Sequence, residues 1–271
     1  MISRRTFAVA HACLAVGTGF AAEASTIAPP ATVLQVGPQR LVKTLNHAAR
    51  LVHPGTVVEV DAGTYVGDVA VWTQPDVSLH AIGGRVRLLA HGAAAEGKGI
   101  WVVRASRMRV TGFDFEGAKV PDRNGAGIRL DRGSLQVIDC RFLYNEMGLL
   151  TNNDPATRLD VQRCEFGFNQ RPDGHNHNLY AGRIASLSVT GSYFHHARTG
   201  HLLKSRAAIN SIRYNRLTDE AGGAASYELE FPDGGLAVVL GNIIAQSSET
   251  QNRHMISFGA ESYHWKRNAL Y

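Results

Sequence analysis

The 271-residue sequence contains no linker rich in Pro, Gly or Ser and no sign of a second domain. Its longest apolar run, residues 7–20, is too short to span a bilayer comfortably, so we do not expect a retained membrane anchor. Cysteine is rare, since only Cys13, Cys140 and Cys164 are present. These absences leave a single domain behind a short N-terminal segment.

The N-terminal segment has the layout of an export signal. Arg4 and Arg5 precede the apolar run, and Ala22-Glu-Ala24 provides a small-residue cleavage site. The two arginines also indicate a twin-arginine signal, which implies export after folding. We expect a signal peptide at residues 1–24, a mature domain at residues 25–271, and a periplasmic or secreted location. Cleavage removes two arginines and one glutamate, which lowers the formal net charge from +5 to +4 and leaves a mildly basic protein that favours anionic partners.

One short phrase with apolar first and sixth places occurs six times between Val110 and Ile244. The copies are Val110-Thr-Gly-Phe113-Asp-Phe115, Val137-Ile-Asp-Cys140-Arg-Phe142, Val161-Gln-Arg-Cys164-Glu-Phe166, Val189-Thr-Gly-Ser192-Tyr-Phe194, Ile212-Arg-Tyr-Asn215-Arg-Leu217 and Val239-Leu-Gly-Asn242-Ile-Ile244. Their first residues lie 27, 24, 28, 23 and 27 positions apart. A repeat of this length indicates stacked units that bury a core only against their neighbours.

The step length and the pattern within each phrase predict strands. Apolar residues at the first, fourth and sixth places suit two short strands separated by a bend, and the step leaves no room for helices. The fourth places form a column, Phe113, Cys140, Cys164, Ser192, Asn215 and Asn242, in which like stacks on like. We therefore predict an all-β fold, a single-stranded right-handed parallel β-helix. A β-sandwich is the alternative, but its strands recur at roughly 8–12 residues.

A second, weaker phrase precedes each repeat and supplies another wall of the coil. Ile100, Leu179, Leu202 and Leu229 each lie ten residues before the Val or Ile that begins the next phrase, so we expect them to point inward and their neighbours outward. Lys204 would then also point inward if the strand continues through it. Since a buried unpaired ammonium is costly, either the strand has turned there or a carboxylate partners Lys204.

The two remaining cysteines after signal cleavage, Cys140 and Cys164, fall one coil apart in the same column. They are close enough to bridge in an oxidising compartment. The preferred interpretation is that they are free thiols serving as small core residues beside Ser192.

The start of the domain resembles a known family. Residues 38–52 predict a helix begun by Pro38, with Leu41, Leu45, Ala48 and Val52 on one face, to cap the first coil. Residues 54–60 read as a strand. Ala48, Pro54-Gly55 and Gly63-Thr-Tyr65 look like the entry to pectate-lyase-like β-helix proteins, and the resemblance covers roughly residues 33–271. It implies the β-helix fold and, less directly, carbohydrate chemistry.

The C-terminal end is expected to be open. After residues 255–258 the chain reaches Tyr271 where another strand should begin, so the β-helix either ends abruptly or is truncated. With no amphipathic closing helix, the exposed edge should invite self-association.

Polar residues that suit catalysis are concentrated between His175 and Glu230. In the expected register Asn178, His201 and Glu228 form one outward row, and Tyr180, Leu203 and Glu230 form the next. Loop histidines and cations surround these rows: His175, His177, His195, His196, Arg183, Lys204 and Arg206.

This combination fits β-elimination on an acidic, uronate-containing polysaccharide. That reaction needs a cation to neutralise the carboxylate, a base for the proton at C5 and an acid for the leaving O4. The candidate catalytic residues are His177 or Lys204 as the base, Tyr180 as proton donor or relay, and Arg206 or Lys204 for the carboxylate, with His201 beside them. Asn178, Arg183, Glu228 and Glu230 are the candidate substrate-binding residues. The expected partner is thus an acidic polysaccharide rather than nucleic acid or, after signal cleavage, a membrane.

A calcium site is a further hypothesis. Glu228-Leu-Glu230 resembles the calcium-binding Glu-x-Glu of chondroitinase-B-like and alginate-lyase-like β-helix enzymes, and two carboxylates on one strand face bind a hard cation. The sequence departs from that pattern at Gly235, where those enzymes look to carry a lysine. The competing interpretation is that both glutamates pair with Lys204 and Arg206.

Two other functions stay open. A glycoside hydrolase of the polygalacturonase type needs paired aspartates on adjacent coils and Gly-His-Gly, of which Thr199-Gly-His201 is only a fragment. Inverting chemistry with Glu228 and a distant acid is the remaining hydrolase option. A non-catalytic polysaccharide-binding or structural β-helix would use Trp101, Tyr180 and Tyr227 as stacking platforms or core.

Overall fold

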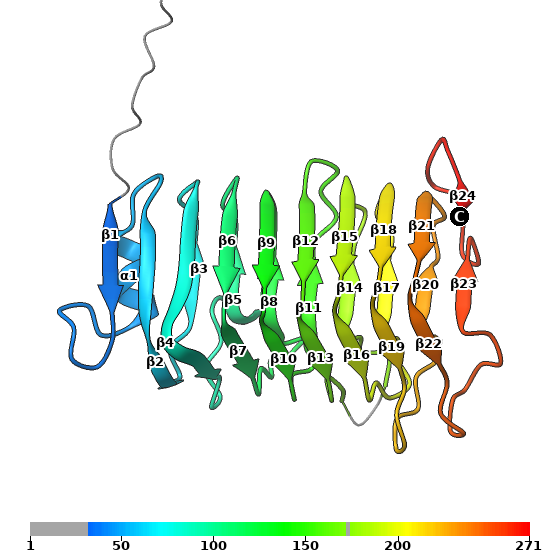
Figure 1. The fold of residues 1–271 in the computed structure, drawn as a ribbon, viewed down its shortest axis with the longest axis horizontal. Helices are drawn as coiled ribbons and strands as arrows, with labels where there is room; N and C mark the ends of the chain where they lie inside the picture. Colours follow the sequence, from blue (N-terminus) through cyan, green and yellow to red (C-terminus); the bar gives the residue numbers. More distant parts are fainter. Residues whose placement is uncertain (1–31, 172–173) are drawn as a thin grey trace, which may run out of the picture. The chain divides into compact units, whose positions relative to one another are not determined.

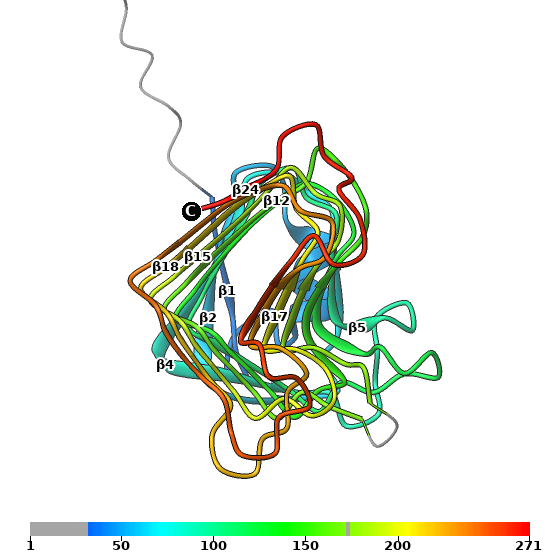
Figure 2. The same ribbon diagram turned by 90° about the vertical axis from the view of Figure 1, so that its right-hand side faces the viewer.

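A computed structural model describes residues 32–171 and 174–271 as a right-handed parallel β-helix. The export signal expected at residues 1–24 lies outside the described residues. Every paired strand runs parallel to its neighbours, and the coils stack their strands into three walls (Figures 1 and 2). The predicted fold class is therefore confirmed.

The first wall is an eight-stranded sheet with one short strand from each coil. Its strands are β3 (Ala70–Trp72), β5 (Gly99–Val103), β8 (Ala126–Leu130), β11 (Met147–Thr151), β14 (Leu179–Ala181), β17 (Leu203–Ser205), β20 (Leu229–Phe231) and β23 (Ile256–Phe258).

The second and third walls belong to one larger sheet, because the long strands of the first coils bend through both. These long strands are β2 (Val57–Val66) and β4 (Val77–Leu89), with β1 (Val33–Val36) paired to β2. The second wall continues with β6 (Met108–Thr111), β9 (Ser134–Ile138), β12 (Arg158–Gln162), β15 (Ser186–Thr190), β18 (Ile209–Arg213), β21 (Leu236–Leu240) and β24 (Ala269–Leu270). The third continues with β7 (Phe113–Glu116), β10 (Arg141–Leu143), β13 (Glu165–Gly167), β16 (Tyr193–His195), β19 (Arg216–Thr218) and β22 (Ile243–Ala245).

The sixfold phrase forms the corner between the second and third walls. Its first residues pair in sequence from Val110 to Val239, as predicted. Its third place has a left-handed backbone in every copy, with glycine in three copies and Asp139, Arg163 and Tyr214 in the others. Its sixth places stack face to face: the ring centroids of Phe115, Phe142, Phe166 and Phe194 lie 5.0, 4.7 and 4.7 Å apart.

The predicted column of fourth places is a hydrogen-bonded ladder. The Cys140 amide donates to Cys164 Sγ, and the Cys164 amide donates to Ser192 Oγ at 3.1 Å. The Ser192 amide donates to Asn215 Oδ1, and the Asn215 amide donates to Asn242 Oδ1, each at 2.9 Å. Both cysteines are buried free thiols, so each serves as one rung that satisfies a buried backbone group.

The predicted register of the first wall is wrong by one residue at two coils. Leu179 pairs with Leu203, and Leu203 pairs with Leu229, so Leu202 is not in that row. Likewise Trp101, rather than Ile100, pairs with Ile128. Leu202 and Leu203 are both fully buried, because Leu202 turns inward at the corner before β17 begins. Lys204 consequently points outward, which removes the conflict over its burial.

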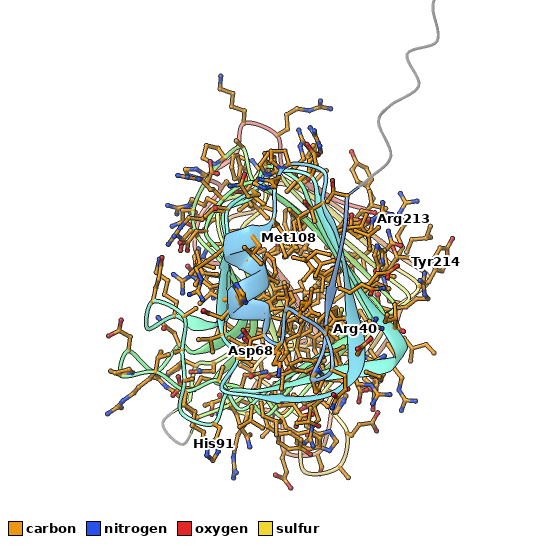
Figure 3. The ribbon with its side chains drawn as sticks, turned by 90° about the vertical axis from the view of Figure 1, so that its left-hand side faces the viewer. Arg40, Asp68, His91, Met108, Arg213 and Tyr214 are labelled. Carbon is orange, nitrogen blue, oxygen red and sulfur yellow. The ribbon has the colours of Figure 1, made fainter. Side chains whose placement is uncertain are left out.

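The single described helix, α1 (Leu45–Leu51), covers part of the N-terminal end of the coil (Figure 3). It begins seven residues later than predicted from Pro38. Thr44 is its N-cap, and the carboxylate of Asp68 accepts from the amides of Leu45 and Asn46 at 2.6 and 2.8 Å. Leu45 and Ala48 are buried as expected, whereas Leu41 is fully exposed and lies outside the helix. No helix among the described residues is long and apolar enough to cross a membrane.

At the C-terminal end, one more short strand follows a segment without strands. Residues 259–268 leave β23, pass over the outside of the coil, and return to β24, which pairs with β21 through Leu236 and Ala237. We call residues 259–268 the strap, because Glu261 in this segment contacts Lys204 of the first wall.

Candidate functional site

An outward row of side chains crosses the first wall. The parallel register aligns Arg129, Leu150, Tyr180, Lys204 and Glu230 on consecutive coils. Neighbouring strands lie about 4.8 Å apart, so these side chains share one surface. The predicted residues Tyr180, Lys204 and Glu230 are thus brought together, with Lys204 in the place expected for Leu203.

A second outward row consists of rings just before these strands. The ring centroids of His177 and His201 are 4.7 Å apart, and those of His201 and Tyr227 are 5.4 Å apart. His177 also lies 5.4 Å from the Tyr180 ring. This row replaces the predicted row of Asn178, His201 and Glu228.

Glu230 joins the two rows electrostatically. Its Oε2 lies 2.9 Å from His201 Nε2 and 2.8 Å from Lys204 Nζ. Burial by itself would raise the pKa of Glu230, but the hydrogen bonds and charges of His201 and Lys204 outweigh burial and lower the pKa to about 2. Glu230 is therefore ionised at neutral pH although it is almost fully buried.

His177 is held as a neutral ring. Burial lowers its pKa well below the usual value, and the positive charges of His201, Lys204, His175 and Arg206 lower it further. The backbone amide of His201 donates to His177 Nδ1 at 3.0 Å. Because Nδ1 accepts the hydrogen bond from this amide, the ring hydrogen of neutral His177 is on Nε2. His177 is consequently a hydrogen-bond donor at its free nitrogen.

Arg206 fixes the phenol of Tyr180. Its Nε donates to the Tyr180 hydroxyl oxygen at 2.9 Å. The rest of the guanidinium contacts the carboxylates of Asp233 and Glu261, and Arg183 Nε lies 2.7 Å from the same Asp233. Asp233 is fully buried, so the two arginines that it pairs with are held in one orientation.

A pocket of about 440 Å³ opens beside His177 and Tyr180 on the side of the earlier coils. Three arginines line it: Arg123, Arg129 and Arg171. Arg171 donates to the backbone oxygens of Gly174 and Arg123, and thereby ties the two loops that wall the pocket. Its other polar lining includes Asn124, Asn152, Asn153 and His175.

Sequence reasoning missed the three pocket arginines and two carboxylates, Asp233 and Glu261. Arg129 had a usable signal, since it occupies the outward place of Gly127-Ile-Arg-Leu130, two coils before Tyr180 in the same row. The others lie on segments without the repeat, where register gives no information about position.

Two predicted substrate-binding residues do not reach this surface. Asn178 is fully buried, and its side chain accepts from Asn169 Nδ2 and donates to the backbone oxygen of His195, both at 2.8 Å. Glu228 is also fully buried, at the corner before β20. Burial raises the pKa of Glu228 to about 7, the nearby Asp219 adds to the rise, and the Gln246 side chain opposes it.

The interior position of Glu228 separates it from Glu230, so the two glutamates do not share a strand face. Among the described residues, no group of three or more metal-ligating side chains has the arrangement of a metal site. The calcium site at Glu228 and Glu230 stays a prediction from the sequence.

The remaining histidines divide between two walls. His175 lines the pocket, as expected. His195 lies instead at the end of β16 on the third wall, where its ring contacts His196 and Glu165. A larger groove of about 660 Å³ lies on the second wall beside Ser134, Arg158 and Ser186, and none of the predicted site residues lines it.

Comparison with known proteins found no family model, no curated protein and no solved structure that matches the chain. The site is therefore interpreted from its own geometry.

Proposed function

We propose that the pocket beside Tyr180 and His177 binds an acidic, uronate-containing polysaccharide and cleaves it by β-elimination. The observation that carries the proposal is Tyr180, which lines a pocket that also contains three arginines and whose hydroxyl oxygen accepts a hydrogen bond from Arg206 Nε at 2.9 Å. A proton-transfer group and a set of cations thus face one space, which is what this reaction requires.

Tyr180 is the proton-transfer residue in this proposal. The guanidinium of Arg206 stabilises the negative charge that the phenol oxygen carries after it loses its proton. Tyr180 then removes the C5 proton of the uronate or returns a proton to the leaving O4. Arg206 acts on the reaction through Tyr180 and is itself oriented by Asp233.

His177 and Lys204 take roles other than the base. Neutral His177 has its lone pair engaged by the His201 amide, so Nε2 donates a hydrogen bond to the substrate. Lys204 Nζ lies 2.8 Å from Glu230 and 3.0 Å from Glu261, which directs its protons to protein carboxylates. Lys204 is therefore a charged partner of carboxylates rather than the base, and His201 links Glu230 to His177.

The arginines supply the positive charge that the uronate carboxylate needs. Neutralising that carboxylate makes the C5 proton easier to remove and stabilises the developing enolate. Arg129, with its side chain largely buried and hydrogen-bonded to Asn152, is held in place before substrate arrives. A preoriented cation loses little entropy when an anion binds.

The hydrolase alternative has less support. Glycoside hydrolysis uses two carboxyl groups on either side of the scissile bond. Asp122 is the only carboxylate among the described residues that line this pocket.

The test is to incubate the purified protein with a panel of uronate polysaccharides and to follow the ultraviolet absorbance of the unsaturated product. The proposal expects absorbance to rise with at least one polymer. New reducing ends without absorbance would mean hydrolysis, and binding without either product would mean a binding protein; both results would overturn the proposal.

A further inference from the structure

The strap, residues 259–268, places a protein carboxylate against two cations at the edge of the proposed site. Glu261 Oε1 lies 3.0 Å from Lys204 Nζ, and its other oxygen contacts the Arg206 guanidinium. Arg206 also holds the Tyr180 hydroxyl, so Glu261 is one residue removed from the pocket wall. In Figure 2 the C-terminal segment, in red, runs along the same side of the coil as β17.

Three cations and three carboxylates form this cluster, and Glu261 differs from the other two carboxylates. The members are Arg183, Lys204, Arg206, Glu230, Asp233 and Glu261. The side chains of Glu230 and Asp233 are 6% and 0% exposed, whereas that of Glu261 is 47% exposed. Without Glu261 the cluster keeps one positive charge in excess, which matches a single carboxylate.

The strap is tied to the coil by several hydrogen bonds besides the ion pairs of Glu261. The amides of Glu261 and Ser262 donate to the oxygen of Pro232 at 3.1 and 3.0 Å, and Trp265 Nε1 donates to the oxygen of Arg206 at 3.1 Å. Most of its other residues are exposed. Ser262 Oγ also donates to Asp233 at 3.2 Å, and the Gly235 amide donates to Asn268 Oδ1 at 2.8 Å. The strap backbone is therefore anchored, whereas the half-exposed Glu261 side chain can turn away from the two cations.

We propose that Lys204 and Arg206 form a carboxylate-binding subsite for a uronate residue, and that Glu261 occupies this subsite until the polysaccharide displaces it. The inference rests on the proposed function for the identity of the ligand. It adds that the strap closes the C-terminal end of the binding surface, so that the polymer approaches from the side of β8 and β11. An incoming carboxylate replaces the Glu261 carboxylate, and the charge of the cluster stays balanced.

The test compares Glu261→Gln with the parent protein in binding of galacturonate, measured by calorimetry without any turnover. Glutamine keeps the shape of the side chain and removes the competing charge. We expect galacturonate to bind roughly tenfold more tightly to Glu261→Gln, and we expect glucose, which lacks the carboxylate, to show no gain. Glu249→Gln is the matched control, because it removes an exposed carboxylate from another loop. Adding Lys204→Met to Glu261→Gln should abolish the gain.

Displacement of Glu261 has its own readout in the unmodified protein. Trp265 lies on the strap, while Trp72 and Trp101 are buried in the core. Because Trp265 Nε1 donates to the backbone oxygen of Arg206, galacturonate bound by Arg206 should change the emission of Trp265. Unchanged affinity in Glu261→Gln, an equal gain in Glu249→Gln, or a gain that survives Lys204→Met would each overturn the inference.

These outcomes separate the two proposals. If the parent protein cleaves a polymer but Glu261→Gln binds galacturonate no more tightly, the inference fails and the lyase function stands. If Glu261→Gln binds galacturonate more tightly but the parent protein cleaves none of the polymers, the subsite stands and the lyase function fails.

Discussion

The Nζ of Lys204 and the Oε2 of Glu230 lie 2.8 Å apart on adjacent parallel strands, with the side chain of Lys204 only 12% exposed and that of Glu230 6% exposed. The pair exists because the register aligns the two residues across β17 and β20. His201 reaches the same oxygen from the preceding corner. Removing one member of such a buried group leaves the others without a partner.

Glu230→Gln should therefore destabilise the protein at neutral pH. The pKa of Glu230 falls from 4.5 to about 2 on folding, so its contribution is present above pH 4.5 and is lost as pH falls towards 2. A shift of this size corresponds to about 3 kcal/mol. Thermal unfolding of parent and variant should differ most at pH 6–8 and converge near pH 2. A difference that does not change with pH would show that the carboxylate charge is not the source of the effect.

Tyr180→Phe tests the proton-transfer role. Loss of a positioned acid or base costs roughly 10²–10⁴-fold in rate, and the ring that packs beside His177 is retained. We expect turnover of a cleaved polysaccharide to fall by this factor with little change in melting temperature. Tyr214→Phe is the matched control, because Tyr214 is 61% exposed at the corner between the second and third walls (Figure 3). Full activity in Tyr180→Phe would remove Tyr180 from the mechanism.

Much of the fold follows from the sequence because one physical pattern repeats. Val110 to Val239 pair as predicted, since a step of one coil and a side-chain period of two leave one way to bury the phrase. The first wall offered no such constraint. Leu202 and Leu203 are both apolar and both buried, so either one satisfies the pattern, and only the backbone at the corner decides that Leu203 faces Leu179.

The candidate site was predictable in part for the same reason. Residues within strands, such as Tyr180 and Glu230, could be placed by register once the coils were recognised. Glu261 and Asp233 could not, because they lie on segments that the repeat does not govern. The burial of Asn178 and Glu228 also escaped prediction, because a corner residue can turn inward against the alternation of the strand that follows.

Replacing Arg4 and Arg5 by lysine tests the export signal. A twin-arginine signal depends on the arginine pair, whereas a general secretory signal needs only positive charge before the apolar run. We expect the double variant to remain in the cytoplasm and the parent to appear outside it with a mature N-terminus near Ser25. Cell fractionation with N-terminal sequencing measures both. Unchanged export of the lysine variant would assign the general secretory route.

Glu228→Gln should stabilise the protein, and only at higher pH. Burial raises the pKa of Glu228 from 4.5 to about 7, so the unfolded chain ionises at a pH where the folded protein still holds the proton. Below pH 4.5 both forms are protonated and the carboxyl costs nothing. Between pH 4.5 and 7 the free energy of unfolding falls progressively. Above pH 7 the total loss reaches about 3 kcal/mol.

Glutamine cannot ionise, so the variant escapes this loss. Melting temperatures measured from pH 4 to 9 should coincide for parent and Glu228→Gln at the acid end and separate progressively above pH 5, with the variant higher. Glu249→Gln, at an exposed position, should show no such separation. A Glu228→Gln variant that melts increasingly below the parent as the pH rises would mean that the ionised carboxylate is stabilised in the folded protein, in conflict with its fully buried position at the corner before β20.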